Sequence, residues 1–292
     1  MRFCEYKTQW TLLRKLAAQS GACEVQEFYA RLMKATGKDI PLQFQWFSEV
    51  KWLDARQPFY KVYPAIAREL LESKLTVNFD VFRVPHNVFS IHLSDADPIS
   101  VGGESRLRSL LVCADPKKAE SQLLIVAAKT GQASDERSLV FPLNIKHGAE
   151  IEGWIASLPL MMPTDSACAV VAAKLAISVC LLAVSQHRLV QNEVLESLRE
   201  KFVVAKDQGE RESIVEKSKR RGVFGWTVGR DLPLETVHGE PSRDIGQRQL
   251  THQHERGGHW HTVCRGPGRG ERVAVYYERI VVRPDLPKKE IA

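Results

Sequence analysis

Residues 166–184 read SACAVVAAKLAISVCLLAV, a stretch that is apolar nearly all round. Asp165 and Ser166 stand where a helix N-cap is expected, so the pattern predicts one helix that continues to Val184. Lys174 lies near the middle of the stretch, and a charge at that depth is costly in lipid. We therefore expect the central buried helix of the protein, not a membrane span.

The region before this helix divides into two parts. Apolar side chains recur at three- and four-residue spacing over residues 10–32, which predicts two helices separated by Gly21, and a third helix is expected near residues 63–72. From about residue 75 the period changes to alternation, which is typical of half-buried strands. The expected strands are residues 77–81, 88–93, 108–113, 122–127 and 138–141.

Helices are expected again after these strands, over residues 150–158, 192–206 and 210–219. The pattern as a whole predicts an α+β fold. It has N-terminal helices, a small antiparallel sheet in a meander, a central buried helix and a basic C-terminal module that contains β-strands. We expect two domains: a mixed helical and sheet body over residues 1–221, and a Gly-, His- and Arg-rich module over residues 222–292.

The positive charge of the chain is concentrated at one end. The formal net charge is +6 over 292 residues, and residues 217–292 hold 15 Lys and Arg against 9 Asp and Glu, while the rest holds 26 of each. A local basic excess favours an anionic partner such as RNA or the ribosome surface. A solvated basic face is an equally good interpretation of an excess this small.

The six cysteines are scattered and form no CxxC pair. Cys168 and Cys180 fall in the apolar helix, where a free thiol behaves as a small apolar side chain. The first 18 residues alternate charged and apolar side chains and contain no uninterrupted apolar core of a secretory signal. These features predict a protein of a reducing compartment, the cytoplasm, with no membrane partner.

The stretch 251–261, THQHERGGHWH, holds four of the nine histidines. Histidines two apart share a face of a strand, but Arg256 would oppose a cation between them, so we expect no metal and no cofactor. A metal-independent ribonuclease that uses His259 and His261 with Arg256 or Arg265 is the alternative enzymatic interpretation. No other catalytic signature is found, and we predict no catalytic residue.

A surface that contacts RNA or the ribosome does not need its side chains to be placed as precisely as a catalytic site does. Guanidinium groups can bind phosphates, and an indole ring can stack on a base. The opposite interpretation has equal weight: Trp260 packs inward, and the histidines hydrogen-bond to strand backbone. The candidate contact residues are Arg256, His259, Trp260, His261, Arg265 and Arg269.

The tail resembles a known family. The pattern His254-x-Arg256-x-Gly258-His259-Trp260-His261, followed by Gly266-x-Gly268 and a strand, is similar to the C-terminal signature of a type V-A anti-CRISPR family. Residues 84–91, VPHNVFSI, also resemble a short strand segment of that family. Two departures are Gly257, which stands where the family has a second arginine, and the additional His252.

The resemblance implies a regulator from a phage or plasmid that acts in a bacterial host. Such a protein recognises the N-terminal peptide of the type V-A effector nuclease during translation and lowers the level of its mRNA. The expected partners are therefore a nascent peptide and RNA or the ribosome. A nucleic-acid-binding accessory protein of a mobile element is a further alternative. Aromatic side chains at high density are more often core, which is the favoured interpretation of one cluster, but the same cluster is the candidate peptide groove: Trp46, Phe47, Trp52, Phe59, Tyr60 and Tyr63.

Overall fold

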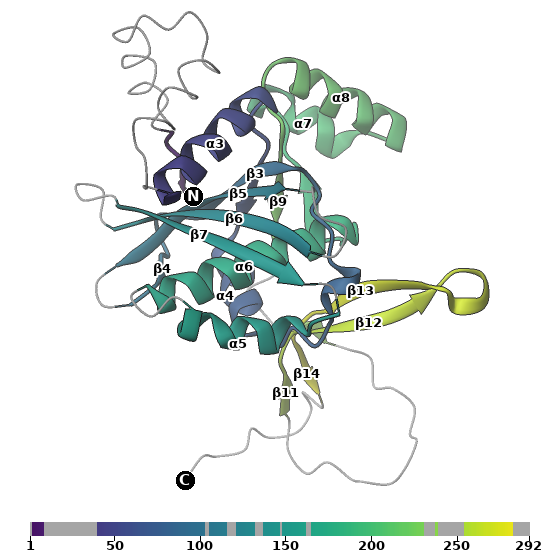
Figure 1. Cartoon of the computed structure of the whole chain (residues 1–292). Coiled ribbons are helices and arrows are strands. Elements are labelled where there is room, and N and C mark those ends of the chain that lie inside the picture. Colours follow the sequence, from purple (N-terminus) through teal and green to yellow (C-terminus); the bar gives the residue numbers. More distant parts are fainter. Residues whose placement is uncertain are drawn as a thin grey trace, which may run out of the picture.

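The structure is a computed structural model of the chain, shown in Figure 1. In the part that it describes, six α-helices accompany a large mixed sheet and a separate two-stranded hairpin, which confirms the α+β class. The helices expected over residues 10–32 lie outside the described residues. The described residues are 2–8, 40–102, 105–115, 121–131, 137–146, 148–161, 165–230, 237–238 and 254–282.

A nine-stranded sheet forms the centre of the fold (Figure 1). Its strands are β1 (Phe3–Cys4), β2 (Phe59–Val62), β3 (Val88–Ser94), β4 (Ile99–Ser100), β5 (Arg106–Asp115), β6 (Ser121–Thr130), β7 (Arg137–Lys146), β8 (Val190–Asn192) and β9 (Gly225–Val228). Seven of them follow the order β7-β6-β5-β3-β2-β9-β8, while β1 pairs with β3 and β4 pairs with β5.

The expectation of a small antiparallel sheet was wrong in size and in strand direction. Strands β3, β5, β6 and β7 do form an antiparallel run. Strand β2, however, is parallel to both β3 and β9, and these pairs join segments far apart in the chain. A local period of two indicates a strand but carries no information about a distant partner, so the parallel centre could not be seen in it.

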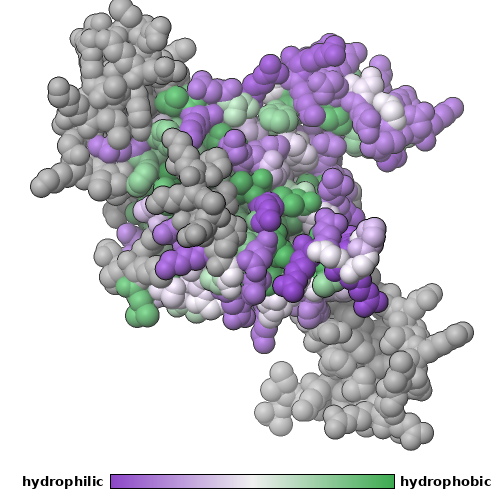
Figure 2. Space-filling model, turned by 45° about the vertical axis from the view of Figure 1, so that its right-hand side comes forward, coloured by the Kyte–Doolittle hydropathy of each residue, from purple (hydrophilic) through white to green (hydrophobic). Residues whose placement is uncertain are grey.

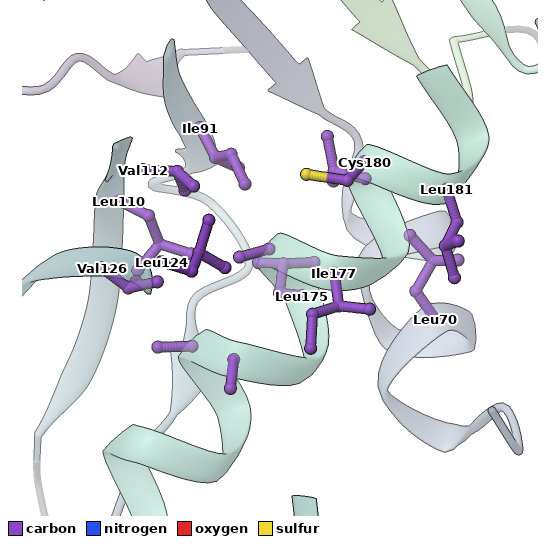
Figure 3. Packing of buried hydrophobic residues seen from close by; sticks show 14 of the residues in the cluster. Leu70, Ile91, Leu110, Val112, Leu124, Val126, Leu175, Ile177, Cys180 and Leu181 are labelled. Carbon is purple, nitrogen blue, oxygen red and sulfur yellow. The ribbon is translucent and has the colours of Figure 1, made fainter. Parts of the chain in front are cut away.

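One face of the sheet packs on helix α6 (Ser166–Val184), and α4 (Pro64–Glu72) and α5 (Ile151–Met161) pack on α6. Among the described residues, α6 is the helix long and apolar enough to cross a membrane, and 67% of that apolar window is buried inside the protein. Figure 3 shows why the sequence is apolar all round. Strand side chains such as Leu110 and Val126 lie on one side of α6, and Leu70 of α4 meets Leu181 on another.

The burial of α6 confirms the predicted central helix and explains its two cysteines. Cys168 and Cys180 are buried in the main core, and burial raises the pKa of the Cys180 thiol. The expected cap is only positional, because Asp165 precedes the helix without a capping hydrogen bond from its side chain. Lys174 reaches the edge of the core and pairs with Glu152 at 3.8 Å.

The opposite face of the sheet is covered in part by α3 (Ile40–Asp54), which lies above the sheet in Figure 1. A second core cluster forms there from Trp52, Tyr6 and apolar residues of β3, β5 and β6. Two charged helices, α7 (Glu196–Val204) and α8 (Gln208–Arg220), pack on each other beyond α3 (Figure 1). The surface over these two helices is mainly hydrophilic (Figure 2).

Two local expectations need correction. Residues 77–81 are not a strand: Phe79–Val81 form a 3-10 helix, η1. Val77 and Phe79 are buried while their neighbours are exposed, so the alternation was real, but it reflected one-sided burial without strand pairing. The helix expected over residues 192–206 is shorter, because residues 190–192 form β8, the edge strand of the sheet.

The C-terminal region contains a two-stranded hairpin of β12 (His259–Arg265) and β13 (Glu271–Tyr277), joined by the turn η2 (Pro267–Arg269). A small sheet contains β10 (Val237–His238), β14 (Ile280–Val282) and β11 (His254–Arg256). Strand β9 comes after the expected domain boundary at residue 222, yet it belongs to the large sheet. The hairpin contributes Trp260, Ala274 and Tyr276 to the main core.

Candidate functional site

Trp260 anchors the C-terminal hairpin to the body. Its side chain is 0% exposed and lies 5.0 Å from the Tyr276 ring, centroid to centroid. Its backbone N–H donates to the Lys74 carbonyl at 3.1 Å, and its carbonyl accepts from the Thr76 hydroxyl. Trp260 therefore packs inward, as the second of the two interpretations has it, and its ring is not available to stack on a base.

Gly258 has a structural role in the same anchor. The Tyr276 hydroxyl donates to the Glu69 carboxylate at 2.7 Å, and the Arg279 N–H donates to the same oxygen at 2.9 Å. A Cβ atom at Gly258 would collide with the Tyr276 hydroxyl and lie 2.7 Å from that carboxylate oxygen. The absence of a side chain thus lets β12 approach α4, which explains one glycine of the motif.

The two histidines after Gly258 lie on the other face of the hairpin. Successive side chains of a strand alternate between faces, so Trp260 points to the core while His259 and His261 point away from it. The His259 ring stacks on the Tyr277 ring, with centroids 5.4 Å apart and planes 13° from parallel. The His261 ring stands edge-on to both rings, and His261 and Tyr277 are exposed.

The outer end of the hairpin is basic. Arg265, Arg269 and Arg272 are all exposed, and none of them pairs with a carboxylate in the part of the chain that the structure describes. Gly266 and Gly268 take positive φ angles of 78° and 67° in the turn, a region open to glycine at little steric cost. The side chains of His254 and Arg256 lie outside the described residues.

This arrangement bears on the metal and ribonuclease interpretations. Cys264 lies on the face of β12 opposite to His259 and His261, so the three side chains do not converge. Within the described ranges, no group of three or more His, Cys, Asp or Glu side chains is placed to hold a metal ion. Arg265 stands four residues beyond His261, or about 13 Å along the strand. That distance does not favour a shared phosphate at a catalytic centre.

A cavity lies elsewhere, on the face of the sheet opposite α6. Its volume is about 1010 Å³. Its floor contains Phe59, Lys61 and His92 of the parallel strands, and α3 with the N-terminal segment forms one wall, while α7 and α8 form the other. We call this cavity the central groove. Its charged lining residues are Glu5, Arg56, Lys61, Glu193, Glu196, Arg199, Lys219 and Arg220.

A stacked pair of rings forms part of the floor of the central groove. Phe59 and His92 lie 5.2 Å apart with their planes 5° from parallel. Gly225, beside Phe59 on β9, permits this position, because a Cβ atom there would collide with the Phe59 ring. His92 Nε2 contacts the Ser90 hydroxyl at 2.9 Å, and its buried Nδ1 has no hydrogen-bond partner among the described residues.

Charged groups surround these rings. Burial and the Lys61 ammonium lower the pKa of His92 to about 4, so the imidazole is neutral near pH 7. The Glu193 carboxylate is only 7% exposed and is held by Arg199 at 3.0 Å and by Lys61 at 3.5 Å. The groove therefore combines an aromatic floor with buried, paired charges, a combination typical of ligand sites.

The structure separates the six aromatic residues that were predicted as a peptide groove. Trp52 and Phe59 line the central groove. Trp46 and Tyr60 are buried at 6% and 1% exposure, and Tyr60 belongs to the main core on the α6 side. The Lys51 ammonium lies over the Phe47 ring, and the Tyr63 and Phe3 ring centroids are 5.2 Å apart. Neither Phe47 nor Tyr63 lines the groove.

Sequence reasoning missed the polar residues of the central groove. His92 sits in a strand whose alternation was recognised, but nothing local indicated that its side chain faces a cavity. Glu193 and Arg199 fell inside an expected amphipathic helix, where charges are usually solvated. Their convergence with Lys61 depends on the parallel pairing of β2 with β9, which brings distant segments together.

Comparison with known proteins identifies the family. No curated protein and no solved structure matches the chain. The family model described as "AcrVA2-like: Anti-CRISPR type V subtype A2 family" matches residues 60–284, which is more than half of the chain. The match extends from β2 to the tail motif and confirms the resemblance noted in the sequence. The chain therefore belongs to the AcrVA2-like family, the type V subtype A2 anti-CRISPR family.

Proposed function

We propose that the protein binds the nascent N-terminal peptide of a type V-A CRISPR effector nuclease and causes translation-dependent loss of its mRNA in the bacterial cytoplasm. Family membership implies interaction with a component of a type V-A CRISPR system. The observation that carries the finer proposal is the central groove, a cavity of about 1010 Å³ with an aromatic floor and charged walls.

The size and lining of the groove suit several residues of an extended peptide. Ligand pockets commonly measure about 300–1,000 Å³, and this one lies at the upper end of that range. Trp52 and Phe59 offer apolar contact for a peptide side chain.

The topology also selects the mode of binding. Extended peptides commonly bind either by adding a strand to a sheet edge or by placing side chains in pockets. Strands β2, β3 and β9 at the floor of the groove each have a neighbour on both sides, so their backbone groups are already paired. A peptide in this groove is therefore recognised by side chains and not by strand addition.

A binding assay tests the groove directly. A fluorescent peptide that carries the first 30 or so residues of a type V-A effector should bind the full-length protein, and the charge reversal R56E/R220E on the groove walls should weaken binding at least tenfold, or about 1.4 kcal/mol. The matched control R211E/K217E reverses two exposed charges of α8 that do not line the groove. Equal affinity for both variants would exclude the groove as the peptide site.

A second experiment tests the link to translation. Reporter mRNAs would carry either an intact effector N-terminus or the same codons in a shifted frame, so that the RNA is nearly identical but the peptide differs. The protein should lower only the mRNA with the intact frame. Loss of both mRNAs would contradict peptide recognition and would favour the alternative, a nuclease that acts on RNA itself.

A further inference from the structure

The hairpin β12–β13 projects from the body (Figure 1). It carries basic and aromatic side chains that have no role in the proposed peptide groove. We call the basic arm the outward face and turn of this hairpin, with His259, His261, Arg265, Arg269 and Tyr277, together with Arg272, which adjoins the turn on the opposite face as the direct partner of Cys264. We propose that the basic arm binds single-stranded RNA, with a base stacked on the His259–Tyr277 ring pair and phosphates bound by the three arginines.

The aromatic part of the arm provides a stacking surface. His259 and Tyr277 lie on directly paired positions of the two strands, and their rings are nearly parallel. Tyr277 is 46% exposed although it is a large side chain with an apolar ring. Exposed rings of this kind stack on unpaired bases regardless of sequence, whereas bases inside a duplex offer no free face. The arm therefore favours single strands.

The charged part of the arm provides phosphate contacts. Glu271 is the one acidic residue between His259 and Tyr277, against three arginines. Those three guanidinium groups are exposed and have no carboxylate partner in the described part of the chain, so their hydrogen-bond donors are available to phosphate oxygens. The six-residue step from His259 to Arg265 covers about 20 Å, which gives a strand of RNA several nucleotides of contact.

The composition of the arm argues against a protein partner as the main occupant. The centres of protein interfaces bury several apolar and aromatic side chains together, and among charged residues they favour only arginine. Tyr277 is the one large hydrophobic side chain of the hairpin that is substantially exposed. The base of the arm is also firmly held, by buried Trp260 and by the two-pronged ion pair of Arg188 with Glu278 at 2.8 and 2.9 Å.

Fluorescence anisotropy with a labelled 12-nucleotide oligo(U) RNA and the full-length protein tests the proposal. Each phosphate contact to a single strand contributes about −0.7 to the slope of log affinity against log salt, so three contacts contribute about −2. Affinity should then fall about 20-fold from 50 to 200 mM salt through these contacts. The variant R265A/R269A/R272A should lose that dependence and bind at least tenfold more weakly at 50 mM salt.

Matched variants distinguish RNA binding by the basic arm from a general effect of the net charge of the protein. K201A/R211A/K217A removes the same charge from exposed positions of α7 and α8 and should bind RNA as the wild type does. Tyr277→Ala should weaken binding at least fivefold, while Tyr277→Phe retains the ring and should bind normally. Thermal melts of all variants would confirm that the fold is intact.

Three results would overturn the proposal. They are unchanged affinity in the triple arginine variant, equal affinity for a 12-base-pair duplex, and binding to purified ribosomes but not to free RNA, which would indicate a folded ribosomal surface and not single-stranded RNA as the partner. The proposal does not depend on the central groove, because the R56E/R220E and R265A/R269A/R272A variants are measured with separate peptide and RNA probes. Failure of one leaves the other unaffected.

Discussion

Trp260→Ala distinguishes an anchoring role of the tail motif from a contact role. Trp260 is 0% exposed, packs on Tyr276 and belongs to the same core as α4 and α6. Truncation would leave a cavity at the point where the hairpin joins the body. The perturbation therefore acts on stability, whereas a change at the exposed arginines of the same segment acts on binding.

The magnitude follows from the burial. A tryptophan buries about 150–250 Å², which at about 25 cal/mol per Å² corresponds to roughly 4–6 kcal/mol, and truncation of large aromatic core residues costs about 3–5 kcal/mol in practice. A loss of about 4 kcal/mol is expected here. With an unfolding entropy of about 2.1 cal/mol/K for each of 292 residues, the melting temperature should fall by about 6 °C.

Differential scanning calorimetry gives the change in melting temperature, and hydrogen exchange shows where protection is lost. The amides of β12 and β13 should exchange faster in Trp260→Ala, since the hairpin has lost its main apolar contact. Trp260→Phe keeps a buried ring and should lose less. If Trp260→Ala instead melted like the wild type and lost only RNA affinity, the ring would be a binding surface, and the anchoring role would be refuted.

Three further predictions follow from the same contacts. Gly258→Ala should destabilise the protein by about 1–3 kcal/mol in chemical denaturation, because its methyl group would displace the bond between Tyr276 and Glu69; Gly257→Ala, with no atom within 4 Å, should be neutral. His92 should contribute a loss of about 2 kcal/mol in stability between pH 8 and pH 5, because its folded pKa is about 4 and the unfolded chain takes up the proton first; His92→Gln should remove this part of the pH dependence in urea titrations at each pH. The variant R265A/R269A/R272A should melt within about 1 °C of the wild type, because its side chains are exposed, and a larger shift would mean that these arginines support the hairpin.

The sequence predicted elements whose signal is local. The apolar run of α6, the short strand-like runs of β3, β5, β6 and β7, and helices α4, α5 and α8 all appear where they were expected. Each of these elements has a hydrophobic pattern that can be recognised within a short stretch of sequence. The family, too, was visible in the tail, because its motif combines glycines and aromatic residues at short, fixed spacing.

The candidate sites were harder to predict from local sequence patterns. The tail motif was singled out, but whether Trp260 faced solvent or core was left open, since alternation does not say which face of a strand is buried. The peptide groove was assigned to an aromatic cluster of which Trp52 and Phe59 line the cavity while Trp46 and Tyr60 are buried. High aromatic density indicates burial more reliably than it indicates a binding surface.

By itself, the sequence determined the α+β class, the central helix and the family, because these depend on composition, period and short motifs. Tertiary structure alone decided that β2 joins β3 and β9 in parallel, and so that Lys61, His92 and Glu193 meet in one groove. It also decided that Trp260 packs inward and that Tyr277 is exposed. The physical reason is that strand pairing and the choice of buried face depend on contacts between distant segments, which no local pattern specifies.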